Sequence, residues 1–228
     1  MDVYTTTVKF FQQGGLFMYP IAIVLALGIA IALERWLYLT FTTAKNKALW
    51  NAVTPYLKAG NLAGAVQVTS KSGAAIGQIM TYGLNRVRSA RRREDVEQAM
   101  EESLMEVMPR LEKRTHYLAT FANIATLLGL LGTIVGLISA FTAVSTANPA
   151  EKADLLSASI SVAMNTTAFG LIVAIPLLLV HTLLQTKTTE IIDSLEMASV
   201  KFLNTITERS GEPQPAPAAG SPKHKAAP

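Results

Sequence analysis

"SISVAMNTTAFGLIVAIPLLL", residues 159–179, contains no charged residue, yet its first half is rich in hydroxyl and amide groups. Its second half is almost entirely hydrocarbon and is interrupted by one proline, Pro176. A helix needs roughly 20 apolar residues to cross a hydrocarbon core about 30 Å thick. The stretch therefore predicts a membrane-spanning helix that carries a polar face.

Two further stretches share this lack of charge. Residues 10–33, 117–150 and 155–186 contain no Asp, Glu, Lys or Arg. A surface helix of a soluble protein would carry a charged stripe. Together with 50% hydrophobic residues and a mean hydropathy of +0.32, this predicts an all-α membrane protein with three transmembrane helices. We expect the second and third helices to be long and to extend into a cytoplasmic helical bundle.

The basic residues indicate the orientation. Twelve Lys or Arg lie from Lys45 through Arg114, between the first and second spans, and five follow the third, whereas Lys9 and Lys152 stand alone in the two other connections. The positive-inside rule then places the N-terminus outside and the C-terminus in the cytoplasm. The predicted order is an external segment (1–15), transmembrane helix 1 (16–41), a cytoplasmic helical domain (42–116), transmembrane helix 2 (117–146), a periplasmic loop (147–154), transmembrane helix 3 (155–186), a cytoplasmic helical extension (187–209) and a disordered tail (210–228).

Within the cytoplasmic domain we expect short helices. Gly60 suits a helix C-terminus, and Asn61 suits the cap of the next helix. From Glu94 onward, apolar residues recur at helical spacing, which predicts a helix that continues into the second span with a bend near Pro109. The tail is rich in Pro, Ala and Gly, which is typical of disorder.

Composition argues against several other classes. A secretory signal is the alternative for the first stretch, but that stretch is long and no basic segment precedes it.

The chain has no cysteine and its three histidines lie far apart, so we expect no disulfide and no metal centre. The basic run "RSARRRED" is followed by acidic residues and contains no aromatic residue, so we expect it to meet solvent or lipid headgroups, not nucleic acid. No nucleophile–base pair or phosphate loop occurs, so we expect neither an enzyme nor a cofactor.

Two of the predicted membrane spans carry polar and small residues at helical spacing, so that these residues share faces of each helix. In the second span Thr126 and Thr133 fall in one sector, and Gly129, Gly132 and Gly136 occupy a neighbouring sector that allows close helix contact. In the third span Ser161 and Asn165 share one face, and Thr167, Gly170 and His181 share another. Pro176 removes one backbone donor, which favours a kink and leaves a carbonyl acceptor.

Such hydroxyl groups most often hold helices together. Their density in two consecutive spans also suits a water-filled path or a cation path, in which the titrating acid would come from another chain. The predicted ion-pathway residues are Thr126, Thr133, Ser161, Asn165, Thr166 and Thr167. His181 is a candidate proton relay, with interfacial hydrogen bonding as the alternative.

Three segments resemble a known family. "LLGLLGTIVGLISAF" (127–141) followed by "AMNTTAFGLIVAIPLLL" (163–179) resembles the paired signature of the MotA/TolQ/ExbB proton-channel family. "GGLFMYPIAIVLALGIAIALERWLYL" (14–39) is similar to the first span of the ExbB and TolQ branch. Three spans, not four, favour that branch over MotA.

The resemblance implies a homopentamer in the bacterial inner membrane whose second and third helices surround an ExbD/TolR-type single-span partner. An aspartate on the partner helix would titrate, and proton flow would drive a TonB-like protein and outer-membrane import. The family's two threonines fall on Thr133 and Thr167, and its shared proline falls on Pro176. Val162 stands where many relatives have glutamate, which puts any glutamate-dependent step in doubt. A TolQ-like or MotA-like role, sodium as the ion, and a passive membrane scaffold remain alternatives.

Overall fold

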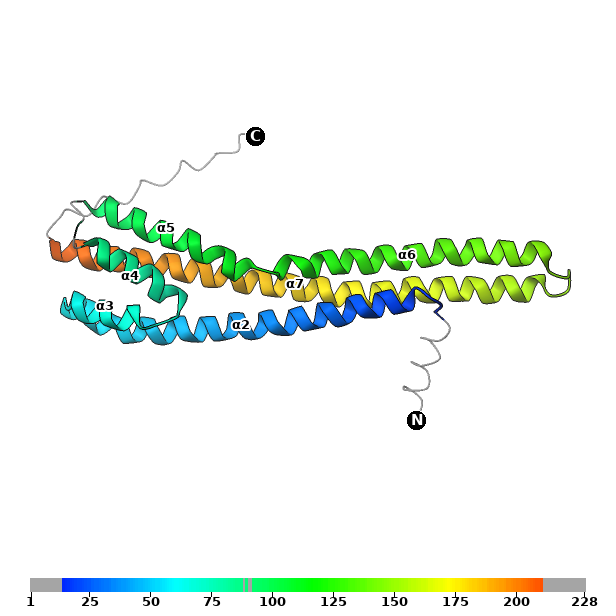
Figure 1. Cartoon of the computed structure of the whole chain (residues 1–228), viewed down its shortest axis with the longest axis horizontal. Helices are drawn as coiled ribbons and strands as arrows, with labels where there is room; N and C mark the ends of the chain where they lie inside the picture. The colour runs from blue at the N-terminus through cyan, green and yellow to red at the C-terminus, as the bar shows by residue number, and fades with distance from the viewer. Residues whose placement is uncertain (1–13, 88, 90–91, 211–228) are drawn as a thin grey trace, which may run out of the picture. The chain divides into compact units, whose positions relative to one another are not determined.

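The computed structural model describes residues 14–87, 89 and 92–210 of the chain. This part consists of helices and connecting turns, and it contains no strand. The helices are α2 (Met18–Ala59), α3 (Leu62–Ser70), α4 (Ala75–Val87), α5 (Arg93–Glu112), α6 (Thr115–Thr146) and α7 (Lys152–Ser210), as Figure 1 shows. The predicted all-α class is confirmed. The predictions for residues 1–13 and 211–228 lie outside the described residues.

Three helical stretches are long and apolar enough to cross a membrane. They are Met18–Ala59, Lys152–Thr207, and Arg93–Thr146, which combines α5 and α6. The prediction of three candidate spans is therefore confirmed. The side of the membrane on which each connection lies stays a prediction.

The chain divides into two compact units. The first unit combines Met1–Thr43 with Met108–Ile192, and the second combines Ala44–Val107 with Asp193–Pro228. Helices α2, α5 and α7 each contribute to both units. We describe each unit by itself.

In the first unit, α6 and the adjoining part of α7 lie side by side and run in opposite directions (Figure 1). The surfaces between them are formed largely by alanine and glycine, including Ala122, Ala125 and Ala163, which are buried. Large apolar side chains point away from the rest of the chain: Leu127, Ile138 and Leu179 are all more than 60% exposed. Contiguous apolar surface of this kind suits lipid or further helices, not water.

Helix α2 continues beyond the predicted end of the first membrane span. The span is predicted to end at residue 41, and one helix of 42 residues runs to Ala59. No glycine or proline lies between the span and Pro55, so nothing in the local sequence stops the helix. Leu49, Val53 and Leu57 recur every four residues and are buried, so the extension has an apolar face of its own.

The junction between α5 and α6 also differs from the prediction. We expected one helix with a bend near Pro109, but Pro109 lies inside α5. The helix ends at Glu112, and α6 begins after Arg114, which has φ 67° and ψ −14° in the left-handed region. No other described non-glycine residue has a positive φ. A left-handed residue interrupts the helical hydrogen-bond ladder, so this is a true break and not a bend.

In the second unit, α3 and α4 pack on the ends of the longer helices. Gly60 has φ 75° and closes α2, and the Asn61 side chain accepts a hydrogen bond from the Gly64 amide at 2.9 Å. Both predicted caps are therefore confirmed. The core of the unit is formed by large apolar side chains that are at most 1% exposed: Ile79, Met80, Leu84, Met100, Leu195 and Phe202.

Replacing Asn61 with alanine removes the α3 cap. Loss of such a cap costs about 1 kcal/mol, so amides at the start of α3 should exchange with solvent about fivefold faster. Hydrogen exchange read by mass spectrometry checks this result. The Asn61→Asp variant keeps a capping oxygen and should exchange like the wild type. Equal exchange in the alanine and aspartate variants would show that the cap does not stabilise α3.

Candidate functional site

Helices α6 and α7 meet backbone to backbone at two glycines. A Cβ atom on Gly170 would lie 2.7 Å from the Ala125 carbonyl oxygen and 3.1 Å from the Gly129 Cα. A Cβ atom on Gly129 would lie 3.3 Å from the Thr167 Cα. These distances are shorter than ordinary van der Waals contact, and backbone atoms cannot swing aside. The contact therefore requires glycine at position 170 and leaves little room for a side chain at position 129.

The contact continues toward the start of α7. A Cβ atom on Gly132 would collide with the Thr166 side chain, and one on Gly136 would lie 2.9 Å from the Ala163 Cβ. The four glycines of the predicted packing set, at 129, 132, 136 and 170, thus all lie along one seam between α6 and α7. We call this contact the glycine seam.

Two of the predicted pathway threonines lie inside this seam. The Thr167 hydroxyl donates to the Gly129 carbonyl oxygen at 2.9 Å and so links the two helices. The Thr166 hydroxyl lies 2.6 Å from the Gly14 carbonyl oxygen and 2.9 Å from the Val162 carbonyl oxygen. Thr166 is only 2% exposed. Both hydroxyl groups therefore satisfy backbone carbonyls within this single chain.

The other predicted pathway residues lie outside the seam. The Thr126 and Thr133 hydroxyls donate to carbonyls of their own helix, those of Ala122 at 3.1 Å and Leu130 at 2.6 Å. Ser161 is exposed and Asn165 is half-buried. Of the six residues, Thr166 is buried, Thr133, Asn165 and Thr167 are half-buried, and Thr126 and Ser161 are exposed within the single chain. Their role in ion passage stays a prediction.

The remaining candidates lie along α7. Pro176 is exposed and lies inside the continuous helix. Val162 is half-buried, and a Cβ atom on Gly15 would lie 3.1 Å from its Cγ1. His181 is half-buried, and its ring centroid lies 6.3 Å from that of His116. Its buried Nε2 atom has no hydrogen-bond partner within the described part of the chain. A hydrogen bond to a neighbouring group would therefore stabilise His181.

Arg35 of α2 holds the α5–α6 junction, a role that the sequence did not reveal. It is 2% exposed, and its Nη2 atom donates to the carbonyls of Arg110, at 3.4 Å, and of Leu111. These carbonyls belong to the last turn of α5, which lacks helical partners for them. A cation at a helix C-terminus also interacts favourably with the helix dipole. Arg35 thus stabilises the end of α5.

Charged and aromatic side chains surround Arg35 at this junction. The Glu34 carboxylate lies 4.0 Å from Arg35 and 3.6 Å from Arg114, so it connects the buried arginine to the left-handed residue. The Arg35 guanidinium also stacks 4.7 Å from the Tyr38 ring centroid. The contacts of Arg35 therefore include a carboxylate and an aromatic ring as well as the backbone carbonyls.

A second link joins α2 to α7 in the same unit. The Lys187 ammonium donates to the Thr40 hydroxyl at 2.7 Å and lies 4.5 Å from the Trp36 ring centroid. Cation–π contacts at exposed sites contribute about 0.5–1 kcal/mol. The polar end of the first unit is therefore held by charged and aromatic groups, whereas its apolar middle is held by small residues.

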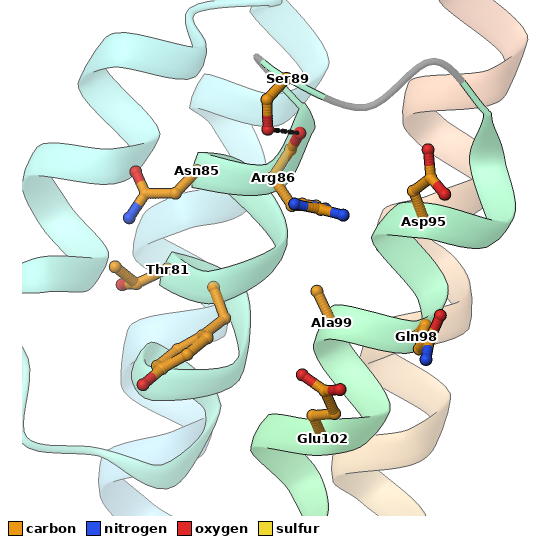
Figure 2. A pocket seen from close by; sticks show the side chains of 9 residues that line it. Thr81, Asn85, Arg86, Ser89, Asp95, Gln98, Ala99 and Glu102 are labelled. Carbon is orange, nitrogen blue, oxygen red and sulfur yellow. Dashed lines mark hydrogen bonds between the residues drawn. The ribbon is translucent and has the colours of Figure 1, made fainter.

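The second unit contains a polar cleft between α4 and α5 (Figure 2), with a volume of about 580 Å³. Figure 2 shows Arg86 extending from α4 toward α5, which presents Asp95 and Glu102. The lining contains no histidine or cysteine. No group of three or more metal-ligating side chains occurs among the described residues. The cleft offers hydrogen-bonding groups of both signs and no constellation for acid–base catalysis.

The fold and the glycine seam define a multi-span helical membrane protein built for close helix association. The chain belongs to the MotA/TolQ/ExbB proton channel family, whose family model matches residues 71–197, more than half of the chain. The match includes all of α6 and most of α7, which form the seam. The predicted family is therefore confirmed, and the chain is a membrane protein of a transport or channel type.

Three relatives are similar over different parts of the chain. An ExbB homolog of Methanothermobacter thermautotrophicus, named for biopolymer transport, is 28% identical over 86% of this chain and 69% of its own length. An ExbB-like biopolymer transport protein of Synechocystis is 29% identical over 76% of this chain and 68% of its own length. The Tol-Pal system protein TolQ of Haemophilus influenzae is 33% identical over 42% of this chain and 40% of its own length.

Replacing Gly170 with alanine should loosen the glycine seam, because the new methyl group meets the Ala125 carbonyl oxygen. Overpacking of this kind costs about 1–3 kcal/mol. Unfolding of the detergent-solubilised chain by increasing SDS, followed by circular dichroism, measures the loss. Gly73→Ala is the matched control, since nothing lies within 4 Å of a Cβ atom at that position. If the two variants unfolded at the same midpoint SDS concentration, the close backbone contact would be contradicted.

Replacing Arg35 with glutamine should release the end of α5. The variant loses the charge at the helix end and has a shorter side chain, and buried hydrogen bonds to charged groups such as that from Arg35 to Leu111 contribute about 1.5–3 kcal/mol. We expect at least tenfold faster amide exchange at residues 112–117, with α3 unchanged as the internal control. Unchanged exchange at 112–117 would show that Arg35 does not hold the junction.

Proposed function

We propose that the chain is the ExbB-type subunit of an ion-driven complex in the bacterial inner membrane. It would conduct protons together with a single-span ExbD-like partner and energise TonB-dependent outer-membrane transport. The observation that carries the proposal is the glycine seam with its threonines, located in the segment that matches the family. The names of two relatives, which are ExbB homologs in biopolymer transport, support the ExbB branch.

The chemistry of α6 and α7 requires a partner for proton transfer. Residues 117–150 and 155–186 contain no Asp or Glu, so these spans offer hydroxyl and carbonyl groups but no carboxylate. Hydroxyls can order water or coordinate a cation, but they do not release a proton near neutral pH. The titrating group would therefore be the aspartate of the partner helix, which matches the arrangement that the family resemblance implies. His181 would serve as a relay at one end of the path.

The apolar outer faces of α6 and α7 support assembly. Leu130, Ile134, Met164 and Ile172 are each between 49% and 66% exposed within the single chain. A membrane helix with this surface can face lipid, a second copy or the partner helix. We propose a homopentamer around two partner helices, with the N-terminus periplasmic and the C-terminus cytoplasmic. Nucleic acid, metal and an organic cofactor have no place in this function.

Alternatives within the family concern the partner and the ion. The similarity to TolQ supports a Tol-type role in envelope maintenance, and the family match leaves a MotA-like stator role as a further alternative. The crowding of Ser157, Ser161, Asn165 and Thr166 also leaves sodium, which needs several oxygen ligands, as a candidate ion. Co-purification identifies the partner, and exchanging proton and sodium gradients across vesicles identifies the ion.

A passive membrane scaffold is the second candidate function. One observation favours it: the Thr166 and Thr167 hydroxyls already bind backbone carbonyls between segments of this chain. Threonines used in this way hold helices together and need not contact an ion. A scaffold would assemble with its partner and leave the membrane impermeable to protons.

Removing two hydroxyls tests conduction against scaffolding. The Thr133→Ala/Thr167→Ala chain is purified with its partner and reconstituted into proteoliposomes. Native mass spectrometry should show an unchanged subunit ratio, and the proton flux should fall at least tenfold. The Thr133→Ser/Thr167→Ser chain keeps both hydroxyls and should retain most of the flux. Wild-type flux in the alanine variant, or no flux in the wild type, would contradict the conduction assignment.

A further inference from the structure

An acidic groove lies in the second unit between α5 and α7. It has a volume of about 310 Å³ and is lined by Glu97, Met100, Glu101, Leu104, Glu196, Ser199, Val200 and Leu203. Met100 and Leu203 are buried at its floor, whereas Val200 is 51% exposed. Apolar side chains therefore form the floor, and three carboxylates stand at the rim. We call this site the acidic groove.

The rim has no basic residue to balance its charge. Glu97, Glu101 and Glu196 form no salt bridge with a described residue, and the groove lining contains no Lys, Arg or His. Like charges that surround an apolar surface repel one another and attract a basic ligand. An exposed apolar floor with an acidic rim therefore fits a segment that combines small apolar residues with basic residues.

The chain itself contains such a segment. Residues 211–228 read "GEPQPAPAAGSPKHKAAP", with Lys223 and Lys225 on either side of His224 and with five prolines. Proline-rich segments favour the extended polyproline conformation, so they lose little entropy when they bind along an apolar groove. We propose that residues 222–227 of this tail dock in the acidic groove of the same chain, with the two lysines beside the rim glutamates.

The tail is long enough to reach the groove. Fourteen residues of α7 separate Glu196 from Ser210, a distance of roughly 21 Å at 1.5 Å per residue. The twelve residues 211–222 extend to roughly 37 Å at 3.1 Å per residue. The tail can therefore turn back along α7 and reach the far end of the groove. Tethering of this kind supplies an effective concentration near the millimolar range, so weak contacts suffice.

This inference does not depend on ion conduction, because it concerns side chains of the second unit alone. A chain that fails to conduct ions could still dock its tail.

Cysteine pairing tests the docking in the full-length chain. The natural sequence contains no cysteine, so Val200→Cys with Ala226→Cys forms one defined pair. We expect a disulfide within one chain, detected by mass spectrometry of the digested protein. The control pair is Tyr82→Cys with Ala226→Cys, because Tyr82 is 50% exposed and lies outside the acidic groove. It should form at least about fivefold less disulfide.

Charge reversal then tests the proposed contacts. Adding Lys223→Glu and Lys225→Glu should lower the yield of the 200–226 disulfide at least about threefold. Salt at 1 M should lower the yield by a similar factor, because it screens exposed charges beyond about 3 Å. Adding Glu97→Lys and Glu196→Lys to the reversed tail should restore the yield. Equal yields at positions 82 and 200, indifference to charge reversal, or linkage only between different copies would overturn the proposal.

Discussion

The close approach of the α6 and α7 backbones is the constraint on which the first unit depends. Gly170 meets the Ala125 carbonyl at a distance that leaves no room for a Cβ atom, and Gly129 meets the Thr167 backbone at a distance that leaves little. Packing at this range fixes the rotation of each helix as well as its separation, because only the glycine face can come so close. The direction in which every other side chain points follows from this contact.

The distribution of polar groups is the first consequence. With glycine facing the seam, Thr167 points across it to the Gly129 carbonyl, whereas Thr126 and Thr133 lie to one side and bond to their own helix. Within the single chain Thr166 and Thr167 contribute to association, whereas Thr126 and Thr133 bond only within α6. This division reconciles the two uses of threonine in membrane helices, as packing groups and as a polar lining.

Local sequence signals predicted much of the fold. The features that these signals missed depend on contacts between segments that are distant in the sequence. Three charge-free stretches, the Asn61 cap and Gly60 follow from neighbouring residues and could be read from the sequence. The break at Arg114 and the burial of Arg35 could not, because Arg35 binds carbonyls 75 and 76 residues away. Likewise, the residue spacing predicted a polar face at Thr166, but its partner, the Gly14 carbonyl, lies 152 residues away in the chain. The sequence signal that could have pointed to the role of Arg35 is its position as a basic residue at the end of an apolar run.

Water accessibility along α6 tests the central claim most directly. Single cysteines in the assembled complex, which has no natural cysteine in this chain, can be labelled with a membrane-impermeant thiol reagent. The account predicts labelling at positions 126 and 133, which lie two helical turns apart on one face, and none at 131 and 138. Equal labelling at all four positions, or labelling only at 131 and 138, would contradict a polar path beside the glycine seam.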